Sequence, residues 1–389
     1  MPGQAAQSIG VPNRIQSLLP EIRRQRAEIE KARQLPRDVA AAMRATGMFR
    51  LAVPRAIGGE EAEPVEILNT IEAIAAADGS AGWCAMIGIA SNVSSGYMNE
   101  TGAREVFADP AAPTAGIAAP AGAAVRADGG MIVNGRWSFA SGITHCDWVW
   151  AGCVVMENGK LRMTATGPEV VHVCMPVREV VIHDTWHVSG LCGTGSNDFS
   201  ATNVFVPQHR LFALLDPADH RKEPLCQMPP LIFFTFELAA VGLGIARAAL
   251  DELRDIAPSK TPTLYSQVLA EKAVVHVDVA RAEAGLRAAR CLLYETVESM
   301  WRNVSGGSVP TKQELAVGHI AATHAVETAA SVTRIANTLA GGSSIYLTAP
   351  LQRHARDAEA LTHHFTVAPH TWEEAGRVFM GREPIVAVY

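Results

Sequence analysis

Two short stretches of the sequence combine small residues with hydroxyl groups between strand-like runs. The longer stretch runs from Trp186 to Pro207 and holds several glycines beside Thr194 and Ser196. The shorter one, residues 136–148, places Ser141 directly before a glycine. Because glycine lets the backbone approach a ligand closely and hydroxyl groups donate hydrogen bonds, both stretches are typical of a site for a flat ligand with polar edges. The alternative is a pair of ordinary β-turns, which use the same residue types.

Aromatic side chains and a histidine lie close to Ser141 in the sequence. Trp137, Phe139 and Trp148 would form the walls of a site for a flat ring, and His145 would add a polar group beside it. Aromatic side chains present large flat apolar surfaces, which suits such a ligand. The alternative is a hairpin corner whose aromatic residues belong to the core of a sheet.

Histidines gather near the centre and the end of the chain. They are His183, His187, His354, His363, His364 and His370. Their spacing matches no metal-binding signature, and HEXXH is absent, so we expect no metal site. A single histidine in a site would act as an acid, a base or a hydrogen-bond donor, because its pKa lies near neutrality.

Other familiar catalytic signatures are missing or incomplete. The run GLGIAR (242–247) lacks the third glycine of a dinucleotide-binding fingerprint and does not follow a strand, so we reject a Rossmann site. Small residues for close helix packing explain this run better. There is no Walker A sequence and no GxSxG elbow. Arg353, Arg356 and Asp357 form a charged cluster, which we interpret as an ion-pair network at a helix end.

The elements that must position these residues fall into three segments. Residues 1–110 have the apolar spacing of an all-helical domain. Residues 111–225 carry short alternating runs between turn pairs, which predicts an antiparallel β domain, a barrel or sandwich of six to eight strands. Residues 226–389 return to helical spacing and predict a four-helix bundle that includes a helix over 264–302. The predicted fold class is therefore α+β.

Composition narrows the possible partners and the cellular compartment. The chain has 389 residues and a formal net charge of −6, and its Lys and Arg residues form no patch dense enough for nucleic acid. No window of about 18 uncharged apolar residues is present, so we expect no membrane span. Seven scattered cysteines without a CxxC pair favour reduced thiols and a cytoplasmic protein.

Several stretches together resemble the acyl-CoA dehydrogenase superfamily, across about residues 14–381. WHVSGLCGTGSNDFSATNVFVP (186–207) is similar to the signature of that family's β domain. ELAAVGLGIARAALDEL (237–253) is similar to its first bundle helix, and LAGGSSIYLTAPLQRHARD (339–357) is similar to its glycine turn and the helix that follows. The resemblance implies an N-terminal helical domain, a central β domain and a C-terminal four-helix bundle.

Details within these stretches resemble one branch of the superfamily, the two-component flavin-dependent aromatic monooxygenases such as the oxygenase component of 4-hydroxyphenylacetate hydroxylase. DGSAGW (78–83) and WSFASGITHCDW (137–148) are similar to the hydroxylase versions. The dehydrogenases use a carboxylate base after the Arg-Asp helix, whereas this chain has two histidines there. In the hydroxylases a histidine seven residues after the aspartate faces the flavin, and that count from Asp357 gives His364.

The resemblance also implies a function. Reduced FAD or FMN, supplied by an NAD(P)H-dependent flavin reductase, would react with O₂ to a C4a-hydroperoxyflavin that hydroxylates a small phenol- or indole-type aromatic compound. Ser141 near flavin N5 and His364 facing the peroxide would be the catalytic residues. The family is tetrameric, which implies a homotetramer here. The residues that we assign to the flavin are Trp137, Ser141, Trp186, Thr194, Ser196, Gly341 and Gly342, and those that we assign to the substrate pocket are Trp83, His145 and His370.

Two other functions stay open at this level. An acyl-CoA dehydrogenase-like flavin desaturase would need a carboxylate beside the flavin, and Glu237 and Glu373 are the candidates. A relative that has lost the flavin and kept the fold as a binding or scaffold protein is the third possibility. Flavin bleaching by an acyl-CoA without O₂ would favour the desaturase, and the absence of flavin binding would favour the scaffold.

Overall fold

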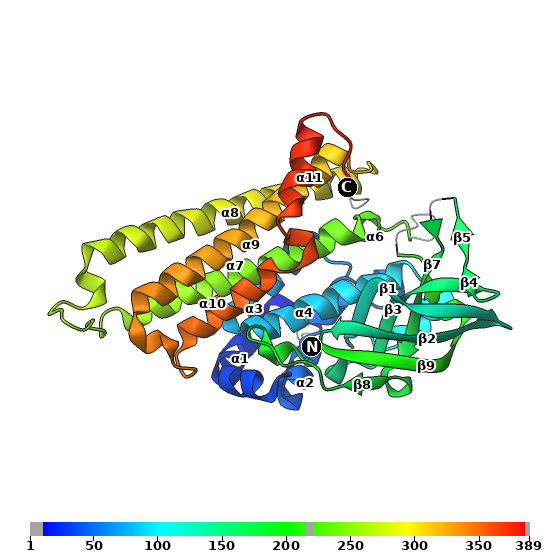
Figure 1. Cartoon of the computed structure of the whole chain (residues 1–389), viewed down its shortest axis with the longest axis horizontal. Coiled ribbons are helices and arrows are strands. Elements are labelled where there is room, and N and C mark those ends of the chain that lie inside the picture. Colours follow the sequence, from blue (N-terminus) through cyan, green and yellow to red (C-terminus); the bar gives the residue numbers. More distant parts are fainter. Residues whose placement is uncertain (1–10, 166, 215–220, 386–389) are drawn as a thin grey trace, which may run out of the picture.

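Along the sequence, helices come before and after a central group of strands, and in space the strands lie at one end of the helices (Figure 1). A computed structural model describes residues 11–165, 167–214 and 221–385. The N-terminal helices are α1 (Val11–Ala32), α2 (Arg37–Ala45), α3 (Pro64–Ala77), α4 (Gly79–Asn92) and α5 (Glu100–Val106). The C-terminal helices are α6 (Pro224–Gln227), α7 (Pro230–Ile256), α8 (Ala273–Ser305), α9 (Lys312–Ala340), α10 (Pro350–Thr362) and α11 (His370–Phe379).

Local sequence signals explain where several helices begin. Asp78 caps α4, because its side chain accepts a hydrogen bond of 2.9 Å from the backbone N–H of Ala81. Thr311 and Glu314 form a capping box at the start of α9. The helix predicted from residue 264 begins only at Ala273. Leu264 has a left-handed backbone with a φ of +69°, and Leu269–Glu271 forms a separate 3-10 turn before the helix.

The strands form a mixed sheet rather than the antiparallel domain that the sequence predicts. The main strands are β1 (Thr114–Ala127), β2 (Gly130–Ala140), β3 (Trp148–Glu157), β7 (Val170–Pro176), β8 (Val181–His183), β9 (Asn197–Pro207) and β10 (Leu211–Phe212), and short strands lie at β4 (Lys160–Leu161), β5 (Met163–Thr164) and β6 (Gly167–Pro168). The order of the large sheet is β10-β7-β3-β1-β2-β9-β8. β1 and β2 form a hairpin, and β3 then pairs with the free edge of β1 in parallel.

One hydrophobic core runs through the helices from both ends of the chain. Residues of α1, α3, α4, α7, α8 and α9 all belong to it, while the sheet has a second core of its own. Small residues allow the helices to approach closely, since a Cβ on Gly244 would lie 2.3 Å from the carbonyl oxygen of Glu72. This contact confirms that GLGIAR is a helix-packing sequence.

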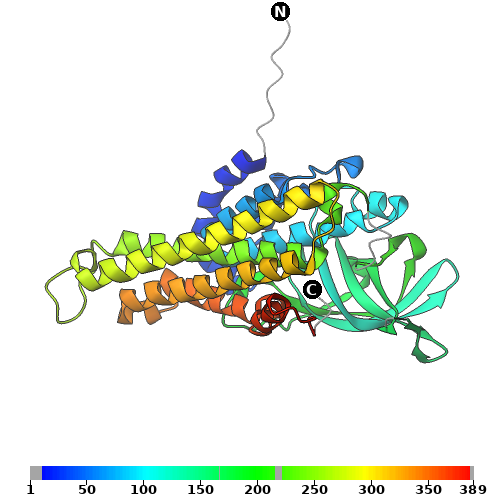
Figure 2. The same cartoon turned by 90° about the horizontal axis from the view of Figure 1, so that it is seen from above.

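The sheet lies at one end of the helical bundle, and both views show this arrangement (Figures 1 and 2). α7 runs through the interior of the bundle. It is the one helix in the described part of the chain that is long and apolar enough to cross a membrane, and 83% of its most apolar stretch is buried inside the protein. Its apolar character is therefore accounted for by its place in the core.

Candidate active site

The hydroxyl groups predicted from the two turn sequences meet in the structure. Ser141 follows the end of β2 and is 5% exposed. Its Oγ lies 2.6 Å from Oγ of Ser196, which in turn lies 2.6 Å from Oγ1 of Thr194. The indole Nε1 of Trp83 donates a hydrogen bond of 2.9 Å to Ser141. Four predicted site residues from three separate parts of the chain therefore form one hydrogen-bonded chain.

His364 approaches the same place from the helical bundle, just after α10. Its Nδ1 accepts from the backbone N–H of Thr366 at 3.4 Å and lies 2.9 Å from the Thr366 hydroxyl. Because Nδ1 is an acceptor, the proton of the neutral imidazole is on Nε2. Burial lowers the pKa of His364 to about 4, so the ring is neutral near pH 7 and Nε2–H is its available donor.

Aromatic rings surround His364 and connect it to Ser141. Its ring centroid lies 6.0 Å from Trp83, 5.3 Å from Phe234 and 4.9 Å from Phe365. Trp83 thus contacts His364 through its ring and Ser141 through its indole N–H. The two side chains predicted to be catalytic share this tryptophan as a common neighbour.

Trp83 lies on one face of α4 together with two smaller apolar side chains. Trp83 and Ile87, each 9% exposed, and half-buried Ala90 are the most exposed side chains of α4. Their spacing of four and three residues places them on one face of the helix. Phe234, Ile87 and Ala90 were not identified as site residues from the sequence, although this spacing was the signal that could have indicated the last two.

The glycines of the long turn contact protein rather than open space. A Cβ on Gly190 would lie 2.2 Å from the carbonyl oxygen of Arg356 in α10, and a Cβ on Gly193 would lie 2.2 Å from Cγ2 of Ile29 in α1. Contact with a neighbouring helix is therefore a sufficient reason for glycine at both positions. The two glycines let the turn pack tightly between α1 and α10, and the hydroxyl of Ser196 lies between those of Thr194 and Ser141.

The predicted role of Trp137 is wrong. Its side chain has no exposed surface, donates to the carbonyl of Gly152 at 2.8 Å and stacks on Phe199 at 5.0 Å. The cause is a break in the β2–β9 register between Trp137 and Ala140. Phe139 sits in this break with a φ of +67° and is 69% exposed. The irregularity turns Trp137 into the sheet core and Phe139 out of it.

Trp186 contacts this exposed phenylalanine. The two rings are 6.2 Å apart in an edge-to-face arrangement, and Nε1 of Trp186 donates to the carbonyl of Leu191 at 3.2 Å. Phe139 and Trp186 therefore form an aromatic corner beside the turn that carries Ser141. A flat ring with a polar edge fits this combination of apolar surface and hydroxyl groups.

The remaining predicted residues are distributed unevenly. His145 packs its ring over Gly142, immediately after Ser141, and burial lowers its pKa to about 4. His370 begins α11, and no hydrogen bond or ring contact between described residues joins it to Trp83, Ser141 or His364. Gly341 and Gly342 are exposed in the connection between α9 and α10. That connection lies at the end of the bundle away from the sheet (Figure 1). Within one copy of the chain they do not lie with the other predicted residues.

A buried carboxylate fixes the turn from the side of α10. Oδ1 of Asp357 accepts a hydrogen bond of 2.6 Å from the backbone N–H of Leu191. Arg356, next to it, instead pairs with Glu30 of α1 at 2.5 Å, and Arg353 lies 3.5 Å from the same carboxylate. The charged cluster expected at this helix is thus an ion-pair network plus one aspartate that binds the turn.

Replacing Asp357 with asparagine should remove part of the pH dependence of stability. Burial, with Asp78 nearby, raises the pKa of Asp357 from 3.8 to about 7. Between these pH values the folded chain holds a proton that the unfolded chain has released, so the wild type loses stability as pH rises. Asparagine keeps the acceptor and does not titrate.

Urea unfolding at about pH 5 and about pH 7 measures this effect. We expect the variant to gain stability relative to the wild type, on the order of 1 kcal/mol per pH unit as pH rises. Unfolding free energies that change in parallel for the two proteins would contradict the assignment of this proton to Asp357.

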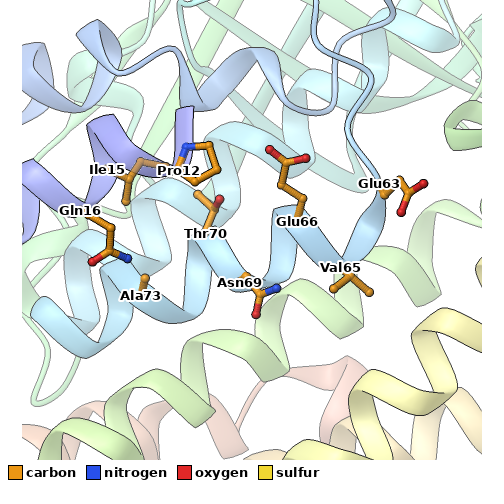
Figure 3. Close-up of a pocket in the computed structure, with 9 residues that line it drawn as sticks. All are labelled: Pro12, Ile15, Gln16, Glu63, Val65, Glu66, Asn69, Thr70 and Ala73. Atoms are coloured by element: carbon orange, nitrogen blue, oxygen red, sulfur yellow. The ribbon is translucent and has the colours of Figure 1, made fainter. Parts of the chain in front are cut away.

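A surface groove elsewhere on the molecule lacks these chemical groups. It has a volume of about 380 Å³ and lies between α1 and α3, where Ile15, Glu66 and Thr70 are among its lining residues (Figure 3). Neither an aromatic residue nor a histidine lines it. The groups with chemistry are at the junction of α4, α10 and the sheet, and that junction is the better candidate for the site.

Comparison with known proteins places this arrangement among characterised families. Residues 18–108 match the family model described as acyl-CoA dehydrogenase, N-terminal domain, and residues 237–369 match acyl-CoA dehydrogenase, C-terminal domain. The chain is similar to indole-3-acetate monooxygenase of Pseudomonas putida, with 36% identity over 92% of this chain and 90% of that protein.

Two further similarities extend over almost the whole chain. The FADH(2)-dependent resorcinol hydroxylase, oxygenase component, of a Rhizobium species is 28% identical over 98% of this chain and 97% of that protein. The crystal structure of 3-HSA hydroxylase from Rhodococcus sp. RHA1 superposes with a TM-score of 0.90 at 27% identity, covering 98% of this chain and 99% of that one.

Proposed function

Because this chain belongs to the flavin-dependent monooxygenase branch of the acyl-CoA dehydrogenase family, we propose an indole-type aromatic compound as its substrate. The chain is the oxygenase component of a two-component enzyme that uses reduced flavin and O₂ to hydroxylate an aromatic compound. The similarity to an indole-3-acetate monooxygenase at 36% identity supports the indole type over the phenol type, since the resorcinol hydroxylase is 28% identical.

The position of Trp83 is the observation that carries the proposal for the site. This residue donates to Ser141 at 2.9 Å and has its ring 6.0 Å from that of His364. It therefore defines a place where a flavin edge at Ser141 and a proton donor at His364 would face the same substrate. Phe234, Phe365 and the face of α4 that carries Ile87 would complete apolar walls around that substrate.

The residues present fit a flavin at the aromatic corner. Ser141 has a hydroxyl oxygen with an acceptor position left over, and Phe139 and Trp186 offer flat apolar surface beside it. We propose that Ser141 binds the polar edge of the isoalloxazine and that Trp186 and Phe139 flank its ring. When bound, the reduced flavin supplies the two electrons that place one atom of O₂ in the substrate and release the other as water.

The protein's own part is to position groups and to exclude water. Nε2–H of His364 would donate a hydrogen bond towards the oxygen that is transferred and so orient it to the substrate ring. The aromatic residues around His364 would keep bulk water out, which limits the release of oxygen as H₂O₂. His145, neutral at pH 7 because burial lowers its pKa to about 4, would contribute a neutral polar group next to Ser141.

A desaturase mechanism does not fit the candidate carboxylates. Glu237 is completely buried, neither of its oxygens has a hydrogen-bond partner among the residues that the structure describes, and burial raises its pKa well above the usual range. Burial thus disfavours the ionised form of Glu237, and no hydrogen bond between described residues joins it to Ser141 or His364. Glu373 is exposed on α11, and no hydrogen bond or ion pair between described residues joins it to Ser141 or His364.

The proposal extends to the partners and the assembly. We propose that an NAD(P)H-dependent flavin reductase delivers the reduced flavin in the cytoplasm, where NAD(P)H is available. A homotetramer built through the helical bundle is supported by exposed apolar side chains on α8, at Val274, Val277 and Leu292. Light scattering coupled to gel filtration measures the assembly, and a monomer would contradict this part of the proposal.

A substrate panel tests the proposed function. The chain is mixed with an unrelated flavin reductase, NADH and flavin, and is offered indole-3-acetate, indole or resorcinol under air. We expect the two indole compounds to gain one oxygen atom by mass spectrometry, and resorcinol to react more slowly. The reductase without the chain is the control. Oxygenation of resorcinol alone would contradict the indole proposal.

A further inference from the structure

Ser141, Ser196 and Thr194 form a series of hydrogen-bonded hydroxyls. The direction of donation along this series follows from Thr194, its last member. Oγ1 of Thr194 lies 2.9 Å from the backbone carbonyl oxygen of Leu191. A carbonyl oxygen only accepts, so the single hydroxyl hydrogen of Thr194 is donated there. Ser196 must then donate to Thr194, and Ser141 must donate to Ser196, over the two contacts of 2.6 Å.

This direction determines what Ser141 can offer a ligand. Its only hydrogen is used by Ser196, and one of its two acceptor positions is used by Nε1–H of Trp83. One acceptor position is left, and there is no free hydrogen. The ligand atom that contacts Ser141 must therefore be a hydrogen-bond donor.

We propose that Thr194, through Ser196, makes Ser141 a hydrogen-bond acceptor only and so selects reduced flavin over oxidised flavin. This inference rests on the proposed function, in which Ser141 binds the edge of the flavin. The reduced isoalloxazine carries N5–H, which can donate to Ser141. The oxidised ring has only a lone pair at N5, and two facing acceptors repel each other. Thr194 is thus a positioning residue that determines which redox form binds.

The carbonyl of Leu191, which accepts the last hydrogen bond of the hydroxyl series, is held from two sides. Leu191 has a left-handed backbone with a φ of +52°, a conformation that non-glycine residues adopt only when the surroundings impose it. Its N–H donates to Asp357 at 2.6 Å, and its carbonyl also accepts from Nε1 of Trp186 at 3.2 Å. This fixed carbonyl holds the Thr194 hydroxyl in one orientation. It thereby fixes the direction of donation through all three hydroxyls.

Thr194→Val tests the inference, because valine has the shape of threonine without the hydroxyl. Ser196 then loses its acceptor and can donate to Ser141, which frees the hydrogen of Ser141 for an acceptor such as oxidised N5. We expect the ratio of the dissociation constants for oxidised and reduced flavin to fall about tenfold, the effect of one ordinary hydrogen bond. Thr194→Ser retains the hydroxyl and should keep the wild-type ratio.

Anaerobic titration with FMN and FAD, each oxidised or fully reduced by dithionite, measures the two dissociation constants. The ratio separates the proposed role from simple damage, which would weaken both forms alike. If the valine variant does not fold, Ser196→Ala frees the same hydrogen and should give the same fall. A wild-type ratio in the folded valine or alanine variant would overturn the inference. If neither redox form binds the wild type, the proposed function fails first.

Discussion

Replacing His364 with alanine should lower the yield of hydroxylated product about a hundredfold while NADH and O₂ are still consumed. The donor at Nε2 is lost, and a positioned proton donor contributes about 100-fold or more to such a step. The change also opens the space between Trp83, Phe234 and Phe365, whose rings contact His364. Water entering there would favour release of H₂O₂.

The ratio of product to H₂O₂ at steady state measures this effect. His363→Ala is the matched control, because the neighbouring histidine is exposed to solvent and its loss should leave the ratio unchanged. Since burial lowers the pKa of His364 to about 4, the neutral ring is the form that acts near pH 7. If His364→Ala kept the wild-type ratio of product to H₂O₂, the proposed role of His364 in the reaction would be contradicted.

Gly190→Ala should destabilise the fold by about 3 kcal/mol, the upper range for overpacking. The added methyl group would lie 2.2 Å from the carbonyl oxygen of Arg356 and 2.7 Å from its carbonyl carbon. Both atoms belong to the backbone of α10 and cannot move aside as a flexible side chain would. The turn would have to shift, and with it Leu191 and the hydroxyl of Thr194.

Gly342→Ala is the matched control for this change. A Cβ there would have no heavy atom within 4 Å, so we expect a change of less than about 0.5 kcal/mol. Unfolding in guanidinium chloride, followed by circular dichroism, measures both variants. Equal stabilities for the two variants would contradict the tight packing of the turn against α10.

The sequence contains strong signals for the order of elements. Helical periodicity and the caps at Asp78 and Thr311 indicate the helices, because these signals are local. Alternating runs indicate the strands, but strand direction depends on which edge β3 joins. That pairing is a contact between distant residues, so the parallel pair could not be read from the local pattern.

Part of the site also follows from the sequence. Ser141, Thr194 and Ser196 were predicted from two turn sequences, and the structure brings them together through contacts of 2.6 Å. His364 and Trp83 were predicted from resemblance, and they lie against each other. Their roles towards flavin and substrate remain predictions, because geometry within the protein alone does not assign them.

The failures have identifiable physical causes. Trp137 and Phe139 are two residues apart, so a regular strand would place both on one face. The irregularity in β2, with a φ of +67° at Phe139, separates them. Gly190 and Gly193 lie in a stretch whose composition is typical of a ligand site, yet the neighbours that a Cβ there would approach belong to α10 and α1. Single-sequence patterns do not contain such long-range contacts.

Isotope labelling tests the central claim most directly. The protein is incubated with a flavin reductase, flavin, NADH and indole-3-acetate under ¹⁸O₂ in ordinary water. Mass spectrometry then measures the mass of the product. A flavin-dependent monooxygenase that acts on indole-type compounds should give a product with one ¹⁸O atom derived from O₂. A product whose oxygen comes from water, or consumption of NADH that yields only H₂O₂, would contradict it.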